Sequence, residues 1–246
     1  MGVNENIRDS MVRVGPLTNI PALLHELGFD PSGIFARSEL DRDVLENPNN
    51  KIPYRTGGEL LSDCLVTTQC ESFGLRLGLM ANTSHLGLAG FMTQTARTVG
   101  HALDALVNNL DLHDQGGVCV LRSNENYSRL SFHIHQPGVR AIEQIYDLSA
   151  VILCKIMRSL CGNDWIASEV TLVRTKPKNL VPYKRYFRTA MVFNSAESSI
   201  LFPEHLLEKV PPSSDELLFH HLEMEADALH QMQHLELVDR LPAMLQ

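Results

Sequence analysis

The chain has 246 residues, enough for one large domain or two small ones and for a sizeable apolar core. It carries 21 Lys and Arg against 29 Asp and Glu residues, a net charge of −8. This balance argues against a chain built to coat a phosphate backbone, because such binding depends on excess positive charge. No run of about 18 apolar residues predicts a membrane span, and no secretory signal precedes residue 20. We therefore expect a cytoplasmic protein with no membrane partner.

The five cysteines are scattered along the chain, and their number is odd. A disulfide framework would leave one of them unpaired, so we expect reduced thiols.

The first half of the chain is predominantly helical by the spacing of its apolar residues. Residues 29–33 have the composition of a turn, and residues 82–90 that of a loop with two glycines. The helices predicted from apolar spacing and capping residues cover residues 20–27, 38–46, 54–68, 73–80 and 91–110.

The second half contains the strand signals. Residues 117–123 and 128–135 alternate apolar and polar side chains around a polar tip, which predicts a hairpin. A helix over 139–160 has a wide apolar stripe and a polar face. The elements predicted after it are a strand at 169–174, a short helix at 182–187, a second hairpin at 190–193 and 199–202, and a helix from the capping residue Ser213 to about residue 234.

This order of elements predicts an α+β fold: a small, mainly antiparallel sheet of about five strands packed with helices. We expect residues 1–246 to form a single domain, in which residues 1–12 are flexible and residues 235–246 begin a linker.

Polar residues recur at steps of three and four along the last predicted helix: His220, Glu223, Asp227, His230 and His234. Metal ligands must converge on one point, whereas a straight helix spreads these five over about 21 Å. We therefore predict no metal site. The chain also lacks phosphate-binding and dinucleotide-binding glycine motifs, so we expect no cofactor.

No nucleophile and base are paired in the sequence, and no Gly-x-Ser-x-Gly motif is present, so we predict no catalytic residue and no enzyme. A buried histidine beside a cysteine or an aspartate in a cleft would favour an enzyme again.

Aromatic and basic residues alternate in the segment Pro182-Tyr183-Lys184-Arg185-Tyr186-Phe187-Arg188. Such a stretch could bind RNA. Given the acidic chain, we favour an amphipathic helix whose aromatic side chains pack on the sheet while the cations face water.

Tyr183-x-x-x-Phe187 is followed by Val192-Phe193 and Ile200-Leu201-Phe202. This order resembles the closing motif of a family of AraC-type regulators, in its arabinose-binding-like N-terminal domain, and the resemblance extends along nearly the whole chain. The upstream segments that agree are Phe73-Gly74-Leu75-Arg76-Leu77-Gly78, Leu86-Gly87-Leu88-Ala89-Gly90 with Thr98-Val99-Gly100-His101-Ala102-Leu103, and Gly162-Asn163-Asp164-Trp165. The chain lacks the Phe-Gly that the family has near Arg188-Thr189 and the Asn that it has near Ser198. These departures affect the conformation of local turns and not the resemblance as a whole.

The resemblance implies a domain that binds a small metabolite or lipid as effector, and that often forms a homodimer. It also implies DNA binding only through a C-terminal helix-turn-helix domain, which would need about a hundred further residues. We therefore expect this chain to be the sensor half without that domain. The sequence leaves open a dimerisation module without a small ligand.

A ligand site is expected to be mostly apolar with a few polar groups. For every candidate residue, the alternative to ligand binding is that its side chain packs in the core. The candidate ligand-binding residues are His85, Phe91, Met92, Thr95, His133, His135, Trp165, Arg174, Tyr183 and Tyr186.

Overall fold

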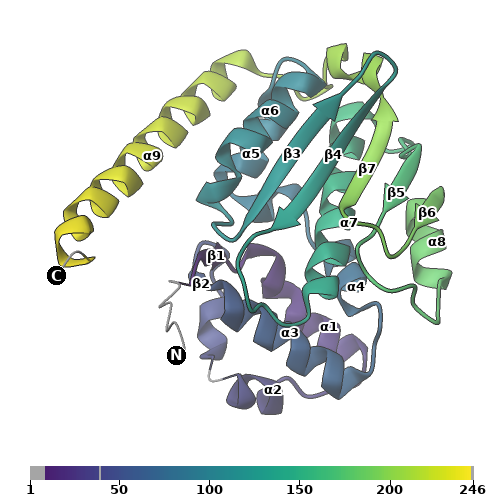
Figure 1. Cartoon of the computed structure of the whole chain (residues 1–246), viewed down its shortest axis with the longest axis vertical. Helices are drawn as coiled ribbons and strands as arrows, with labels where there is room; N and C mark the ends of the chain where they lie inside the picture. Colours follow the sequence, from purple (N-terminus) through teal and green to yellow (C-terminus); the bar gives the residue numbers. More distant parts are fainter. Residues whose placement is uncertain (1–8, 39, 245–246) are drawn as a thin grey trace, which may run out of the picture.

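A five-stranded sheet covered by helices forms the larger part of the molecule, and a smaller helical layer with a two-stranded sheet packs below it (Figure 1). The computed structural model describes residues 9–38 and 40–244. The α+β architecture predicted from the sequence is confirmed.

The larger sheet has the strand order β3-β4-β7-β5-β6. Its strands are β3 (Gly117–Ser123), β4 (Tyr127–Ile134), β5 (Glu169–Thr171), β6 (Ala190–Val192) and β7 (Ser198–Pro203). The hairpin of β3 and β4 is confirmed, with Leu121 opposite Leu130. The second predicted hairpin is wrong. Strand β6 pairs in parallel with β5, and β7 lies antiparallel between β4 and β5. The prediction pairs β6 with β7 because these strands are adjacent in the sequence, but β7 instead pairs with β4 and extends the sheet from there.

Helices cover one face of this sheet. Helix α7 (Ile142–Cys161) crosses behind β4 and β7, and α6 (Val99–Asn109) packs on β3 (Figure 1). The α7 stripe from Ile145 to Leu160 is buried, as its periodicity predicts, and the helix ends at Gly162 with φ +108°. Positive φ favours glycine.

The lower layer contains β1 (Met11–Arg13), β2 (Lys51–Pro53) and four helices. These helices are α1 (Ile20–Glu26), α2 (Ser32–Arg37), α3 (Tyr54–Thr68) and α4 (Phe73–Met80). Helix α4 lies against α7 with its backbone close. A Cβ atom at Gly74 would come within 2.0 Å of the Gln144 carbonyl oxygen. Glycine is unfavourable inside a helix, but Gly74 and Gly78 let α4 and α7 pack closely.

Four stretches of the first half differ from the predictions. The predicted turn at 29–33 contains the start of α2, and in place of the helix predicted over 38–46 the described residues of that stretch contain the 3₁₀ turn η2 (Arg42–Leu45). The predicted loop at 82–90 contains the 3₁₀ turn η3 (Thr83–Leu86) and the start of α5 (Leu88–Thr95). The single helix predicted over 91–110 is divided into α5 and α6. The cause is Thr98, whose side chain accepts a hydrogen bond from the His101 amide and so caps α6.

Most of the remaining elements match their predictions. Helix α8 (Val181–Phe187) buries Tyr183 and Phe187 while Lys184, Arg185 and Arg188 are exposed. Short 3₁₀ turns η1 (Gly15–Asn19), η4 (Leu110–Leu112) and η5 (Glu204–Glu208) connect the layers.

Helix α9 (Glu216–Met244) runs beside α5 and extends clear of the body (Figure 1). The prediction that Ser213 caps it is wrong, because the Ser213 hydroxyl donates to the Gln94 carbonyl. Asp215 accepts from the Leu218 amide instead. Among the residues that the structure describes, no helix is both long and apolar enough to cross a membrane.

Residues 1–8 and 245–246, which fall in the predicted flexible end and the predicted linker, lie outside the described residues. All five cysteines are free thiols, as expected.

Candidate functional site

An internal cavity lies where the lower layer meets α7 and the sheet; we call it the central cavity. It is bounded by β1, η1, α3, α6, η4, α7 and the start of the β3–β4 hairpin. Its walls are mainly apolar side chains, among them Leu17, Leu61, Leu106, Leu110, Phe132 and Ile152. A concave, apolar space with a few polar groups is the usual form of a small-molecule site.

The size of the central cavity suits a small organic molecule. The centre of a water-sized sphere can occupy about 80 Å³ of it. One water-sized sphere itself occupies roughly 10–15 Å³, less than the space open to sphere centres alone. The central cavity therefore has room for several non-hydrogen atoms.

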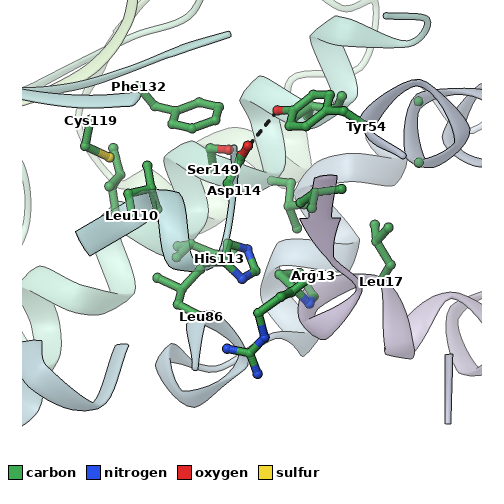
Figure 2. A pocket seen from close by; sticks show the side chains of 18 of the residues that line it. Arg13, Leu17, Tyr54, Leu86, Leu110, His113, Asp114, Cys119, Phe132 and Ser149 are labelled. Atoms are coloured by element: carbon green, nitrogen blue, oxygen red, sulfur yellow. Dashed lines mark hydrogen bonds between the residues drawn. The ribbon is translucent and has the colours of Figure 1, made fainter. Parts of the chain in front are cut away.

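Polar groups enter the central cavity from segments far apart in the sequence. Figure 2 shows Tyr54 and Asp114 joined by a hydrogen bond, with His113 and Arg13 farther along. The Tyr54 hydroxyl donates to Asp114 Oδ2 at 3.3 Å, and the Gly116 amide donates to Asp114 Oδ1 at 2.9 Å. Burial raises the pKa of Asp114 to about 6, although these hydrogen bonds favour the ionised form.

His113 is held by its backbone while its side chain lacks a partner. The Arg13 amide donates to the His113 carbonyl at 2.8 Å, and the His113 amide donates to the Leu110 carbonyl at 2.8 Å. Atom Nδ1 is buried without a hydrogen-bond partner. Burial, then the charges of Arg13, Lys51 and His85, lower the pKa of His113 to about 3. The ring is therefore neutral at physiological pH, with an unsatisfied polar atom.

These residues do not form a nucleophile–base pair. Cys119 also lines the central cavity, but burial raises the pKa of its thiol to about 12, so it is a poor nucleophile. Asp114 bonds to Tyr54 and backbone amides, and the depressed pKa makes His113 a weak base. The structure therefore has a buried histidine next to an aspartate, the arrangement named above as favouring an enzyme, but the lowered pKa leaves the His113 ring neutral and weakly basic.

The ten side chains predicted from the sequence do not line the central cavity. His85, in η3, accepts a hydrogen bond from the Asn82 amide at 3.4 Å. In α5, Phe91 is exposed, whereas Met92 and Thr95 are buried. The Thr95 carbonyl accepts from the Asp215 amide at the base of α9. Of these four residues, Thr95 therefore contacts the base of α9.

His133 and His135 lie toward the end of β4. His133 Nε2 is 2.9 Å from Ser131 Oγ and 3.7 Å from Glu197 Oε2. His135 follows the strand and donates its amide to the Gly116 carbonyl at 2.9 Å. His133 therefore belongs to a small polar cluster with its strand neighbours.

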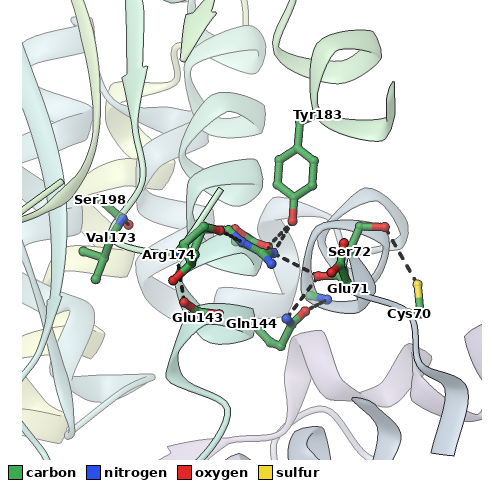
Figure 3. Close-up of polar contacts among 12 residues, drawn as sticks. Cys70, Glu71, Ser72, Glu143, Gln144, Val173, Arg174, Tyr183 and Ser198 are labelled. Carbon is green, nitrogen blue, oxygen red and sulfur yellow. Dashed lines mark hydrogen bonds and ion pairs between the residues drawn. The ribbon is translucent and has the colours of Figure 1, made fainter. Parts of the chain in front are cut away.

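Arg174 and Tyr183 meet at a buried carboxylate (Figure 3). Asp147 of α7 forms an ion pair with Arg174 and accepts from the Tyr183 hydroxyl at 2.5 Å. Burial raises the pKa of Asp147 to about 6, partly offset by both partners. Arg174 also donates to the Glu71 carbonyl at 2.9 Å. These contacts join α7, α8 and the segment before α4, and they are typical of a structural cluster.

Arg158 of α7 bridges Trp165 and Tyr186. Its Nε donates to the Trp165 carbonyl at 3.3 Å and its Nη2 to the Tyr186 carbonyl at 3.0 Å. The Tyr186 ring lies under the Arg158 guanidinium, 4.3 Å from centroid to Cζ. The Trp165 ring packs edge-on against Phe202.

The sequence reasoning missed Arg13, Tyr54, His113 and Asp114. His113 and Asp114 could have been found from the sequence. They are a polar pair between the end of a helical pattern and the Gly116-Gly117 start of the first hairpin. No group of three or more His, Cys, Asp or Glu residues in the described part of the chain is arranged to hold a metal ion.

Comparison with known proteins identifies relatives. The family model for the arabinose-binding domain of AraC transcription regulators, N-terminal, matches residues 28–210. The HTH-type transcriptional regulator VirS, in two strains of Mycobacterium tuberculosis, is 24% identical over 155 residues, which are 62% of this chain and 46% of VirS. This chain therefore spans about half the length of the curated relatives it matches.

A solved structure shares the fold. The crystal structure of the transcriptional regulator CdpR from Pseudomonas aeruginosa superimposes with a TM-score of 0.52 at 21% sequence identity. The match covers 79% of this chain and 59% of CdpR.

Proposed function

Because this chain belongs to the family of N-terminal arabinose-binding domains of AraC transcription regulators, we propose that it senses a small effector in the central cavity. In this proposal the effector alters DNA binding by a helix-turn-helix domain such as the one that the description of VirS names. The observation that carries the proposal is a mainly apolar cavity containing an unpartnered, buried His113 Nδ1. The site of action is the cytoplasm, where the DNA lies.

The elements around the central cavity also hold α9. Leu110 and His113 line the central cavity, and Asp111 between them contacts His230 of α9, with 3.1 Å between Oδ1 and Nε2. Phe219 of α9 stacks on His101 of α6, with 4.3 Å between ring centres. An effector that binds one arrangement of η4 better than another shifts the population of α9 positions. Helix α9 is therefore the proposed output element.

Self-association is the second part of the proposal. Leu217, Met224, Ala228 and Leu235 are exposed and recur at steps of seven, four and seven, which places them on one face of α9. The opposite face packs on the body through Phe219, Leu222 and Ala226. We propose that two copies pair through the exposed stripe, defined here as these four residues, to form a homodimer.

A dimerisation module without an effector and an enzyme are the other candidate functions. The relatives are transcriptional regulators, and the pKa values at the central cavity do not support a base or a nucleophile. The ligand-binding role of the ten residues predicted from the sequence remains a prediction, which the following experiment also tests.

A cavity-filling variant tests the effector site. Ser149 of α7 lines the central cavity, so Ser149→Leu narrows it, and Ser159→Leu makes the same change in the same helix outside it. The measurement is the melting temperature of each protein with a panel of neutral and charged metabolites. A ligand at 100 times its Kd adds about 2.7 kcal/mol of stability. For a chain of this size that is roughly 5–10 °C.

We expect at least one compound to raise the melting temperature of the wild type and of Ser159→Leu. The concentration of that compound needed for the same rise in Ser149→Leu is expected to be at least tenfold higher. Equal binding by all three proteins would place the ligand elsewhere, including at the residues predicted from the sequence. No stabilisation by any compound would favour the dimerisation module.

A further inference from the structure

The Arg13 end of the central cavity carries uncompensated positive charge. In the described part of the chain, no carboxylate oxygen lies within 4.0 Å of the Arg13 guanidinium. Within the described residues, its Nη2 donates to the neutral Asn49 side chain. Burial lowers the pKa of Arg13, which indicates a partly desolvated cation without an acidic partner. Such a cation gains most from an anion that arrives from outside the chain.

The surrounding charges have the same sign. Arg13, Lys51 and His85 are the groups whose charges disfavour protonation of His113. The one carboxylate of the central cavity, Asp114, is engaged by Tyr54 and by backbone amides. Although the chain as a whole carries a charge of −8, two cations, Arg13 and Lys51, lie near His113 at this end of the central cavity, whereas burial lowers the pKa of His85 and keeps that ring neutral. The field therefore selects for an anionic group at this end.

The backbone places Arg13 beside His113 and its side chain close to Gly87. The Arg13 guanidinium lies directly over Gly87, where a Cβ atom would be only 1.3 Å from Nη1. Gly87 has φ +63°, a conformation that favours glycine. The Arg13 backbone is paired with β2 and bonded to the His113 carbonyl, so Arg13 and His113 are held next to each other. In Figure 2 both lie on the Leu86 side, away from the Tyr54–Asp114 pair.

We propose that the effector is a small organic acid whose carboxylate binds Arg13 and accepts a hydrogen bond from His113, and whose apolar part lies between α3 and α7. This inference rests on the proposed function and names the chemical class that its site takes. A planar guanidinium suits a carboxylate because it offers two parallel N–H donors. Leu61, Ile152 and Phe132 supply the apolar walls.

The test compares acids with neutral molecules of the same shape. The probes are hexanoate and phenylacetate, each paired with its amide, titrated at pH 7.5 by ligand-observed NMR. We expect each acid to bind the wild-type chain at least tenfold more tightly than its amide. Arg13→Gln removes the charge and abolishes this preference, Arg13→Lys retains part of it, and the exposed Arg185→Gln retains all of it.

The outcomes separate the ligand class from the proposed function. Amides that bind as tightly as acids, or an acid preference that survives in Arg13→Gln, would overturn the acid inference and leave the effector site intact. If neither probe class binds, the acid inference is wrong, and the melting-temperature panel decides the proposed function on its own. If Arg13→Gln does not fold, the acid and amide pairs on the wild-type chain decide the question.

Discussion

His113 and Arg174 are both buried and ionisable, and their surroundings give them different roles. His113 has a polar atom without a partner and borders open space. The Arg174 guanidinium is occupied by Asp147, the Tyr183 hydroxyl and the Glu71 carbonyl. Unsatisfied polar groups in cavities attract ligands, whereas satisfied clusters fix elements relative to one another. Arg174 Nε also donates to the Thr175 carbonyl, so a ligand that used Arg174 would have to displace existing partners.

Removing Arg174 leaves the Asp147 carboxylate buried and unpaired. We predict that Arg174→Met lowers the free energy of unfolding by about 3–5 kcal/mol, the usual cost of breaking a buried pair. Adding Asp147→Asn recovers part of this loss because the buried charge is gone. The measurement is urea denaturation, with the exposed Arg185→Met as the control, expected to change stability by less than ~0.5 kcal/mol. A loss below ~1 kcal/mol for Arg174→Met contradicts a structural role.

The depressed pKa of His113 makes stability depend on pH. In the unfolded chain a histidine binds a proton below about pH 6.5, whereas folded His113 stays neutral down to about pH 3. The unfolded state therefore binds more protons, and acidification favours it. Relative to His113→Gln, we predict that the wild type loses about 2 kcal/mol between pH 7 and pH 5, measured by urea denaturation. A difference between the two proteins that does not change with pH contradicts this environment.

At the scale of single elements, the long amphipathic helices and strands could be predicted from the sequence. Helix α7 and the β3–β4 hairpin each have enough residues for an apolar period to show. Strands β1 and β2 have three residues each, too few for a period, and pairing of β6 with β5 depends on contacts across the sheet. The α5–α6 break depends on the cap at Thr98, a residue equally compatible with a continuous helix.

The candidate site could not be predicted from the sequence either, because it also depends on a short strand and on contacts between distant segments. Arg13 enters through unpredicted β1, Tyr54 begins α3, and His113 and Asp114 follow η4. Their proximity depends on the bonds of β1 to the segment before β3, such as the Gln115 amide to the Met11 carbonyl at 3.0 Å. The aromatic and basic residues of α8 were prominent in the sequence, but its aromatic side chains pack against the body and its basic side chains are exposed.

Helix α9 has an exposed apolar stripe that predicts its behaviour in solution. Met224→Glu places a charge in the stripe and is expected to weaken the dimer at least tenfold, because the charge must be desolvated at the interface. His234→Glu adds the same side chain at an exposed position outside the stripe. Sedimentation equilibrium measures both. A wild-type monomer, or a dimer unaffected by Met224→Glu, contradicts pairing through α9.

At the scale of the whole molecule, the central cavity lies between the two layers and adjoins the elements that hold α9. Beta strands, helices and 3₁₀ turns of both layers contribute to its walls. A ligand there contacts the lower layer through Arg13 and Leu17, and α7 through Leu148 and Ile152. This arrangement allows occupancy to change how the layers pack, which is what a sensor domain needs to transmit a signal.

The central claim is that the effector occupies the central cavity. A crystal structure of the chain with the tightest-binding compound of the panel tests it directly. The account predicts ligand density enclosed by α3, η4 and α7, with the polar end of the ligand within hydrogen-bonding distance of Arg13 and His113. Density at the His133 cluster, at the Arg174–Tyr183 contact or on the surface of α5, with the central cavity empty, would contradict it.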